Sequence, residues 1–289
     1  MTPHLAAASA RRVSWATVLL WLLGSLVAVA WAAPFVWMVS TSLKPVADVM
    51  TVHVEWVPRH VTLDNYAKVL EKPVLHWLFN SVVVSVVSTG VSLLTGAMAG
   101  YALARLNFPG RGIAFFLVLG ALMIPTEMTI VPLFIGFLSL GLVNNYPALI
   151  LPSLASVLSV YIFRQFFLSL PRELEDAAAI DGANRFRTFF SVALPLAKPA
   201  VVAGAILLFT TYWNAFLWPL LVILKEDMRT LPVGMAAFAP GTGVGQQTQL
   251  QSFGPAMAAM TILTIPSLLV FLFLQRHFIA GVTSSGLKG

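Results

Sequence analysis

The sequence predicts an all-α integral membrane protein with about six transmembrane helices. Charged residues make up only 10% of its 289 residues and hydrophobic residues 58%, whereas a soluble domain carries about 25% charged residues. So few charged side chains cannot cover a globular surface, and part of the solvent must therefore be lipid. The apolar residues also form long runs flanked by charges, and these runs reach the about 20 residues that a spanning helix needs.

Six segments with few charges predict the spans of a single transmembrane domain, residues 1–289. The first follows Arg11 and Arg12 and ends before Lys44. The third contains Glu127, which comes after Pro125 at a point where a helix can break. We favour a structural role or an outer-interface position for Glu127 over ligand binding. The expected spans are 13–40, 78–104, 113–136, 148–170, 200–224 and 255–275.

The distribution of lysine and arginine predicts that both termini are cytoplasmic. Inner loops carry an excess of these residues, and with the N-terminus inside they hold most of the 17. The alternative, a cleaved signal peptide after Arg11 and Arg12, is disfavoured because the apolar stretch exceeds the about 7–15 residues of a signal core. The inner residues are Arg11, Arg12, Arg105, Arg111, Arg164, Arg172, Arg185, Arg187, Lys198, Arg276 and Lys288, and the outer ones are Lys44, Arg59, Lys68, Lys72, Lys225 and Arg229.

The sequence lacks the residues and motifs that several kinds of chemistry require. There is no cysteine, and the five histidines show no spacing typical of metal ligands. Neither a phosphate-binding G-x-x-x-x-G-K-[ST] loop nor a G-x-S-x-G nucleophile elbow occurs. The net charge of +6 comes without a basic run, so it does not indicate nucleic acid as a partner. We expect no catalytic residues, metal or cofactor in this chain.

The inner segment 171–195, between the fourth and fifth spans, carries the most informative pattern. Pro171 suits the first position of a helix. Gly182 suits the position just past its end, because glycine adopts positive φ. A second helical stretch then leads from Arg185 to Pro195. The acidic residues of the first turn, where the helix dipole favours anions, are Glu173, Glu175 and Asp176, and the face with small residues comprises Leu174, Ala177, Ala178 and Asp181.

Such a short helix, held near the membrane by two spans, suits docking into a groove of another protein. An amphipathic helix lying on lipid headgroups is the alternative. The acidic first turn argues against an anionic lipid surface, so the pattern favours docking and leaves the alternative open.

The same loop resembles the EAA signature of bacterial ATP-binding cassette (ABC) importer permeases. That signature runs acid-Ala-Ala, three residues, Gly, nine residues, then an aliphatic residue, one residue and Leu-Pro. Asp176 stands where the family usually has Glu, which keeps the charge with a shorter reach. The matching positions are Asp176, Ala177, Ala178, Gly182, Val192, Leu194 and Pro195.

Further motifs resemble the carbohydrate branch of these permeases, of the maltose-transporter second-subunit type. They lie at residues 63–66, 80–81, 100–105, 108–110, 125–127, 164–167, 213–214, 218–219 and 281–289. The resemblance implies import of a sugar, oligosaccharide or related polyol across the bacterial inner membrane. It implies a second permease subunit, an ATPase pair that binds ATP and Mg²⁺, and an extracytoplasmic solute-binding protein probed by the outer loop 241–249.

By this resemblance the segment 171–195 is the coupling loop, and its first helix is the coupling helix that contacts the ATPase. The residues expected to couple to the ATPase are Glu175, Asp176, Ala177, Ala178, Asp181, Gly182 and Pro195. The tail 281–289 is expected to reach the ATPase pair as well.

A polar run in the fifth span offers candidates for the translocation path. Amide and hydroxyl groups can hydrogen-bond sugar hydroxyls, and aromatic faces can stack on a sugar ring. Serine and threonine also bond neighbouring helices, and tryptophan often marks a membrane interface, so a packing role stays open. The candidates are Tyr212, Trp213 and Asn214, which follow Thr210 and Thr211.

Three other functions compete with the sugar importer. A permease for amino acids or peptides would share the EAA loop. An ion-coupled secondary carrier would need ionisable groups inside the spans and internal repeats, and neither is evident in the sequence. A membrane-embedded enzyme would need a catalytic constellation, which the sequence also lacks.

Overall fold

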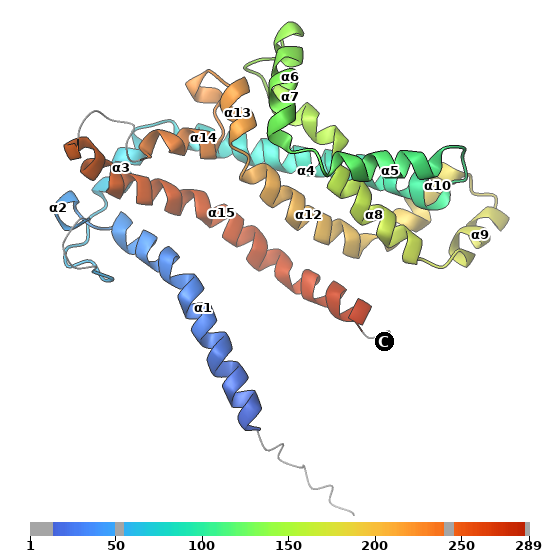
Figure 1. Cartoon of the computed structure of the whole chain (residues 1–289), viewed down its shortest axis with the longest axis horizontal. Helices are drawn as coiled ribbons and strands as arrows, with labels where there is room; N and C mark the ends of the chain where they lie inside the picture. Colours follow the sequence, from blue (N-terminus) through green and yellow to red (C-terminus); the bar gives the residue numbers. More distant parts are fainter. Residues whose placement is uncertain (1–13, 50–54, 240–245, 287–289) are drawn as a thin grey trace, which may run out of the picture.

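The computed structural model describes residues 14–49, 55–239 and 246–286. These residues form helices joined by turns and contain no strand (Figure 1). In chain order the elements are α1 (Trp15–Ser42), α2 (Val46–Val49), α3 (Asp64–Leu70), α4 (Val74–Arg105), α5 (Arg111–Ala121), α6 (Thr126–Ser139), α7 (Tyr146–Ile150), η1 (Leu151–Ala155), α8 (Val157–Ser169), α9 (Glu173–Ile180), α10 (Arg185–Thr188), η2 (Phe189–Ala193), α11 (Leu194–Leu196), α12 (Lys198–Trp213), α13 (Leu217–Val222), η3 (Glu226–Met228), α14 (Leu231–Met235), η4 (Ala236–Phe238) and α15 (Gln246–Gly286).

The described residues hold four helices that are long and apolar enough to cross a membrane, or up to six spans if two bent pairs are included. The four are α1, α4, the stretch Tyr146–Ser169 and the part Ser252–Phe273 of α15. The bent pairs are α5 with α6, at 99°, and Arg185–Leu196 with α12, at 75°. Four to six candidate spans are consistent with the predicted six.

Two predicted spans are broken rather than continuous. The expected span 113–136 turns sharply between α5 and α6, and Pro125 caps the second helix in an extended conformation. The expected span 200–224 ends at Trp213, and α13 begins only at Leu217. A proline has no N–H and its ring clashes with the carbonyl four residues earlier. Pro125 stands at the first break, and Pro219, in the first turn of α13, has no N–H to donate to Ala215 at the second break.

Helix α4 is the centre of the fold and packs most closely on α8 (Figure 1). Gly96 and Gly100 form a G-x-x-x-G pair on this face. A Cβ atom at Gly96 would lie 2.0 Å from Ser159 Oγ. A Cβ atom at Gly100 would lie 2.8 Å from the backbone nitrogen of Arg164. Small residues at this spacing let two helices approach closely in a membrane. Ser159 Oγ also donates to the Ser92 carbonyl across the contact.

Polar side chains from the segments 63–66 and 80–81 hold the loops near the start of α4. Asn80 donates to the carbonyls of Asp227 and Arg229, and Ser81 Oγ accepts from the Leu231 N–H. In the other segment, the Asn65 amide donates to the carbonyls of Ser42 and Lys44 just past α1, and the Tyr66 hydroxyl contacts Ser42 Oγ. The two asparagines thus satisfy backbone carbonyls of the loops, and Ser81 satisfies a backbone N–H at the start of α14.

Candidate functional site

The loop between α8 and α12 contains a short exposed helix, α9. It begins at Glu173 after the N-cap Arg172, so Pro171 lies before the cap and not at the first helical position that the sequence suggested. At the other end Gly182 has φ +78°, as predicted. Its N–H donates to the Ala179 carbonyl, and the Ala183 N–H donates to the Ala178 carbonyl. This pair of bonds is a Schellman motif, which requires the left-handed conformation that glycine adopts freely.

The chain then re-enters the helical core through α10, η2 and α11. The Asn184 side chain caps α10 by accepting from the Arg187 N–H at 2.9 Å. The next five residues form a π-helical turn whose Phe189 and Ala193 are buried beside Tyr101 and Phe167. The helical stretch predicted from Arg185 to Pro195 is therefore present, with one wide turn inside it.

Most of the residues expected to couple to an ATPase lie on the surface. Asp176, Ala177, Asp181, Gly182 and Pro195 are exposed, and Ala178 is half-buried. Two apolar side chains of α9 are also exposed, Leu174 at 42% and Ile180 at 87%. The helix thus presents small, acidic and apolar groups together at one end of the molecule (Figure 1).

Glu175 differs from the other acidic residues of α9 because it points toward the core. Its Oε1 lies 3.0 Å from Nε of Arg105, the last residue of α4. The Arg105 side chain is only 4% exposed. The sequence analysis missed this pair because the two residues are 70 positions apart; the available signal was an arginine that ends an otherwise uncharged span.

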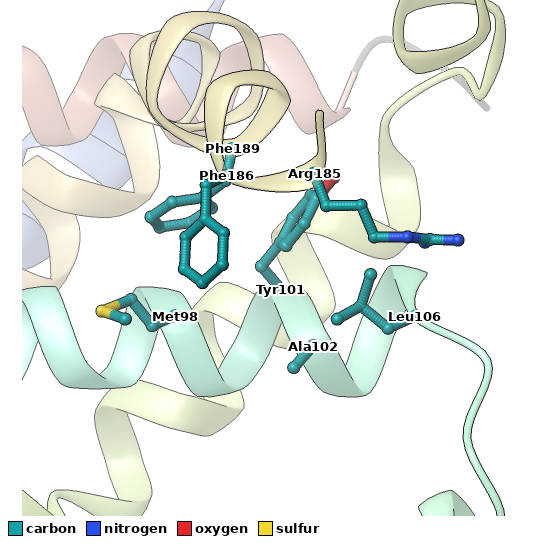
Figure 2. A pocket seen from close by; sticks show the side chains of 7 residues that line it. All are labelled: Met98, Tyr101, Ala102, Leu106, Arg185, Phe186 and Phe189. Carbon is teal, nitrogen blue, oxygen red and sulfur yellow. The ribbon is translucent and has the colours of Figure 1, made fainter. Parts of the chain in front are cut away.

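An apolar cavity of about 280 Å³ lies between α4 and the start of α10. In Figure 2 the rings of Phe186 and Phe189 extend toward α4, and the Arg185 guanidinium points away from the cavity. Its lining residues are Met98, Tyr101, Ala102, Leu106, Arg185, Phe186 and Phe189.

The three candidates for the translocation path lie in three different environments. The Tyr212 hydroxyl contacts Ser92 Oγ on α4 at 2.6 Å, and Ser92 Oγ donates its own proton to the Ser153 carbonyl. Trp213 is 1% exposed, and its Nε1 donates to the Leu263 carbonyl on α15. Asn214 is exposed and its amide donates to the Thr210 carbonyl. The structure therefore does not gather the three side chains into one pocket.

The structure also shows the environments of Glu127 and Arg164. Glu127 is exposed in the first turn of α6, where the helix dipole favours a carboxylate. The Arg164 guanidinium lies 3.5 Å above the ring of Phe115, a cation–π contact. The described residues contain no group of three or more His, Asp or Glu side chains able to hold a metal ion.

Some predictions fall outside the described residues or side chains. Arg11, Arg12 and Lys288 are among them, as is the glycine-rich part of the loop 241–249. The side chain of Arg276 and those of the tail 281–289 are not described either.

Comparison with known proteins identifies the family. Residues 92–284 match the family described as "Binding-protein-dependent transport system inner membrane component". The chain belongs to this family. It is therefore an inner membrane transport component and not an enzyme, as the sequence predicted.

Relatives cover nearly the whole chain. The "Arabinooligosaccharides transport system permease protein AraQ" of Halalkalibacterium halodurans is 42% identical over 260 residues, which is 89% of this chain and 91% of that protein. The "Diacetylchitobiose uptake system permease protein NgcG" of Streptomyces coelicolor is 36% identical, covering 97% and 91%. The "Trehalose/maltose transport system permease protein MalG" of Thermococcus litoralis is 36% identical, covering 91% and 94%. The amino acid and peptide alternative gains no support.

A solved structure confirms the fold class. The chain superimposes with a TM-score of 0.79 on a chain of a bacterial ABC transporter "involved in the import of the acidic polysaccharide alginate". The two chains are 23% identical, and the match covers 96% of this chain and all of the other. The chain therefore has an all-helical ABC permease fold.

Proposed function

We propose that this chain is one of two permease subunits of an ATP-driven importer for an oligosaccharide, sugar or related polyol. Relatives named for arabino-oligosaccharides, diacetylchitobiose and trehalose or maltose support this substrate class. The second permease, a separate ATPase pair that binds ATP and Mg²⁺, and an extracytoplasmic solute-binding protein complete the importer.

The observation that carries the proposal is the exposed helix α9 with its Schellman cap. A helix whose apolar Leu174 and Ile180 face solvent is suited to a protein partner that covers them. Its acidic first turn selects a basic groove over an anionic lipid surface. In this role α9 is the coupling helix and enters a groove of the ATPase.

The positions of the basic residues support a cytoplasmic location for α9. The end of α4, the start of α5, the end of α8 and the start of α12 lie together with α9 at one end of the molecule (Figure 1). Positive charge in short loops marks the cytoplasmic side. The basic residues of these segments and of the neighbouring α10 are Arg105, Arg111, Arg164, Arg172, Arg185, Arg187 and Lys198.

For the translocation path, the exposed face at the end of α12 is the best-supported candidate. Thr210, Thr211 and Asn214 are exposed. The two threonines stand four and three residues before Asn214, so each lies on the same side of the helix as Asn214. Hydroxyl and amide oxygens along this face can accept hydrogen bonds from a passing sugar.

Affinity purification tests the proposal. An N-terminal tag is added, source membranes are solubilised gently, and co-purifying proteins are identified by mass spectrometry. We expect a P-loop ATPase and a second permease, with the ATPase reduced for Gly182→Trp. The purified complex in proteoliposomes is then offered arabinotriose, diacetylchitobiose, trehalose and maltose. A protein that is recovered alone and still transports would refute the proposal in favour of a secondary carrier.

A further inference from the structure

Arg105 joins three helices at the inner end of the core. It is the last residue of α4, and its Nε lies 3.0 Å from Glu175 Oε1 in the first turn of α9. Its Nη2 donates to the carbonyl of Leu170, the C-cap residue of α8. The planar guanidinium suits such multiple contacts, which a lysine ammonium cannot reproduce in the same geometry.

The Arg105 end of the ion pair is buried, and the Glu175 end is partly exposed. The Arg105 side chain is 4% exposed and that of Glu175 is 21% exposed. Arginine does not lose its proton in proteins, so removing Glu175 would leave a buried cation without its counterion. Glu173 and Asp176, in the same turn, are exposed and available to a partner protein. One carboxylate of the turn thus points inward, and two lie on the surface.

Apolar burial does little to fix α9. No residue of this helix, all of which the structure describes, is buried. By contrast, α4 packs on α8 and α12, and its Tyr101 and Ala104 belong to a buried cluster. A displacement of α9 can reach this core along the connecting chain or through Arg105. The direct side-chain link from α9 to α4 is Glu175, which pairs with Arg105 and also interacts with the Tyr101 hydroxyl.

We propose that Arg105 is a positioning residue that clamps the coupling helix α9 to α4 through Glu175. The clamp makes α9 and the inner end of α4 move as one body when the ATPase moves α9. Glu175 then acts toward the core, whereas Asp176 and Asp181 face the ATPase. This inference rests on the proposed docking role of α9.

Distance measurements test the clamp directly. The chain has no cysteine, so Ile180→Cys on α9 and Phe108→Cys just past α4 accept two spin labels for double electron–electron resonance. We expect one narrow distance distribution in the parent protein, and a broad or shifted one in Arg105→Gln and Glu175→Gln. Glu173→Gln, which removes a charge from the same turn, is the matched control and should keep the parental distribution. An unchanged distribution in Arg105→Gln would overturn the clamp.

Transport measurements test its role in coupling. In proteoliposomes with the ATPase and binding protein, arabinotriose uptake per ATP hydrolysed should fall about tenfold in Arg105→Gln and in Glu175→Gln. The exchange R105E/E175R should recover only the part of the loss that comes from the ion pair, because a carboxylate at 105 cannot donate to the Leu170 carbonyl. Parental uptake per ATP in both single variants would contradict the clamp. If no ATPase co-purifies with the parent chain, the proposed function fails instead, and the label distances still decide whether the clamp exists.

Discussion

Gly182 offers the sharpest test of the coupling helix, because its backbone conformation can be changed without a steric clash. Its φ of +78° closes the Schellman motif that ends α9. A Cβ atom added there would have no neighbouring heavy atom within 4 Å. Any effect of a substitution therefore comes from the backbone conformation and not from crowding by the rest of the protein.

The expected cost follows from that conformation. An ordinary L-residue in the left-handed region is destabilised by about 1–2 kcal/mol, and asparagine by less because it visits this region more readily. A β-branched residue is disfavoured further. About 1–2 kcal/mol corresponds to a roughly 5- to 30-fold loss in the population of the capped helix. No residue of α9 is buried, so the stability of the membrane core should change little.

The assay compares Gly182→Asn, Gly182→Ala and Gly182→Val for ATPase co-purification and uptake, with the thermal unfolding temperature as a control. We expect activity to decrease in the order Gly, Asn, Ala, Val while the unfolding temperature stays close to that of the parent protein. Equal activity of the valine and glycine proteins would refute the reasoning. So would an alanine variant more active than the asparagine variant, since the left-handed conformation would then not be what matters.

Four further predictions concern the fold and the path. Gly96→Val should destabilise the protein by about 1–3 kcal/mol, because its Cβ would lie 2.0 Å from Ser159 Oγ; Gly90→Ala on the same helix, where nothing lies within 4 Å, should show no such loss in thermal unfolding. Asn65→Ala removes the donor to the Ser42 and Lys44 carbonyls and should cost about 2–4 kcal/mol by the same measurement. Trp213→Ala should cost about 3–5 kcal/mol, since this side chain is buried. Asn214→Ala should leave stability nearly unchanged and raise the KM for sugar uptake; an unaltered KM would remove Asn214 from the path.

The short helix of the loop 171–195 and its end at Gly182 were largely predictable because their determinants are local in sequence. The acidic first turn, the small-residue spacing and Gly182 all act within one short helix. The presence of several candidate spans, four to six in the described residues, was predictable from the sequence because hydropathy reports how long a segment can remain in lipid.

The continuity of the spans was not predictable from hydropathy alone. Hydropathy does not register a missing N–H, so the segments around Pro125 and Pro219 read as unbroken, although α6 begins only after Pro125 and residues 214–216 separate α12 from α13. The proline positions were the available signal. The Arg105–Glu175 pair was harder still to predict, because no local pattern shows which distant arginine will pair with a given acidic residue.

The run 212–214 shows why neighbours in sequence make poor candidates for one binding surface in a helix. Successive residues of an α-helix point about 100° apart, so three in a row cover most of the circumference. Accordingly Tyr212 reaches Ser92 on α4, Trp213 reaches α15, and only Asn214 is exposed. Residues three and four positions apart share a face, and Thr210 and Thr211 stand at those distances from Asn214. A search for the translocation path should therefore follow this face of α12 and not the consecutive run.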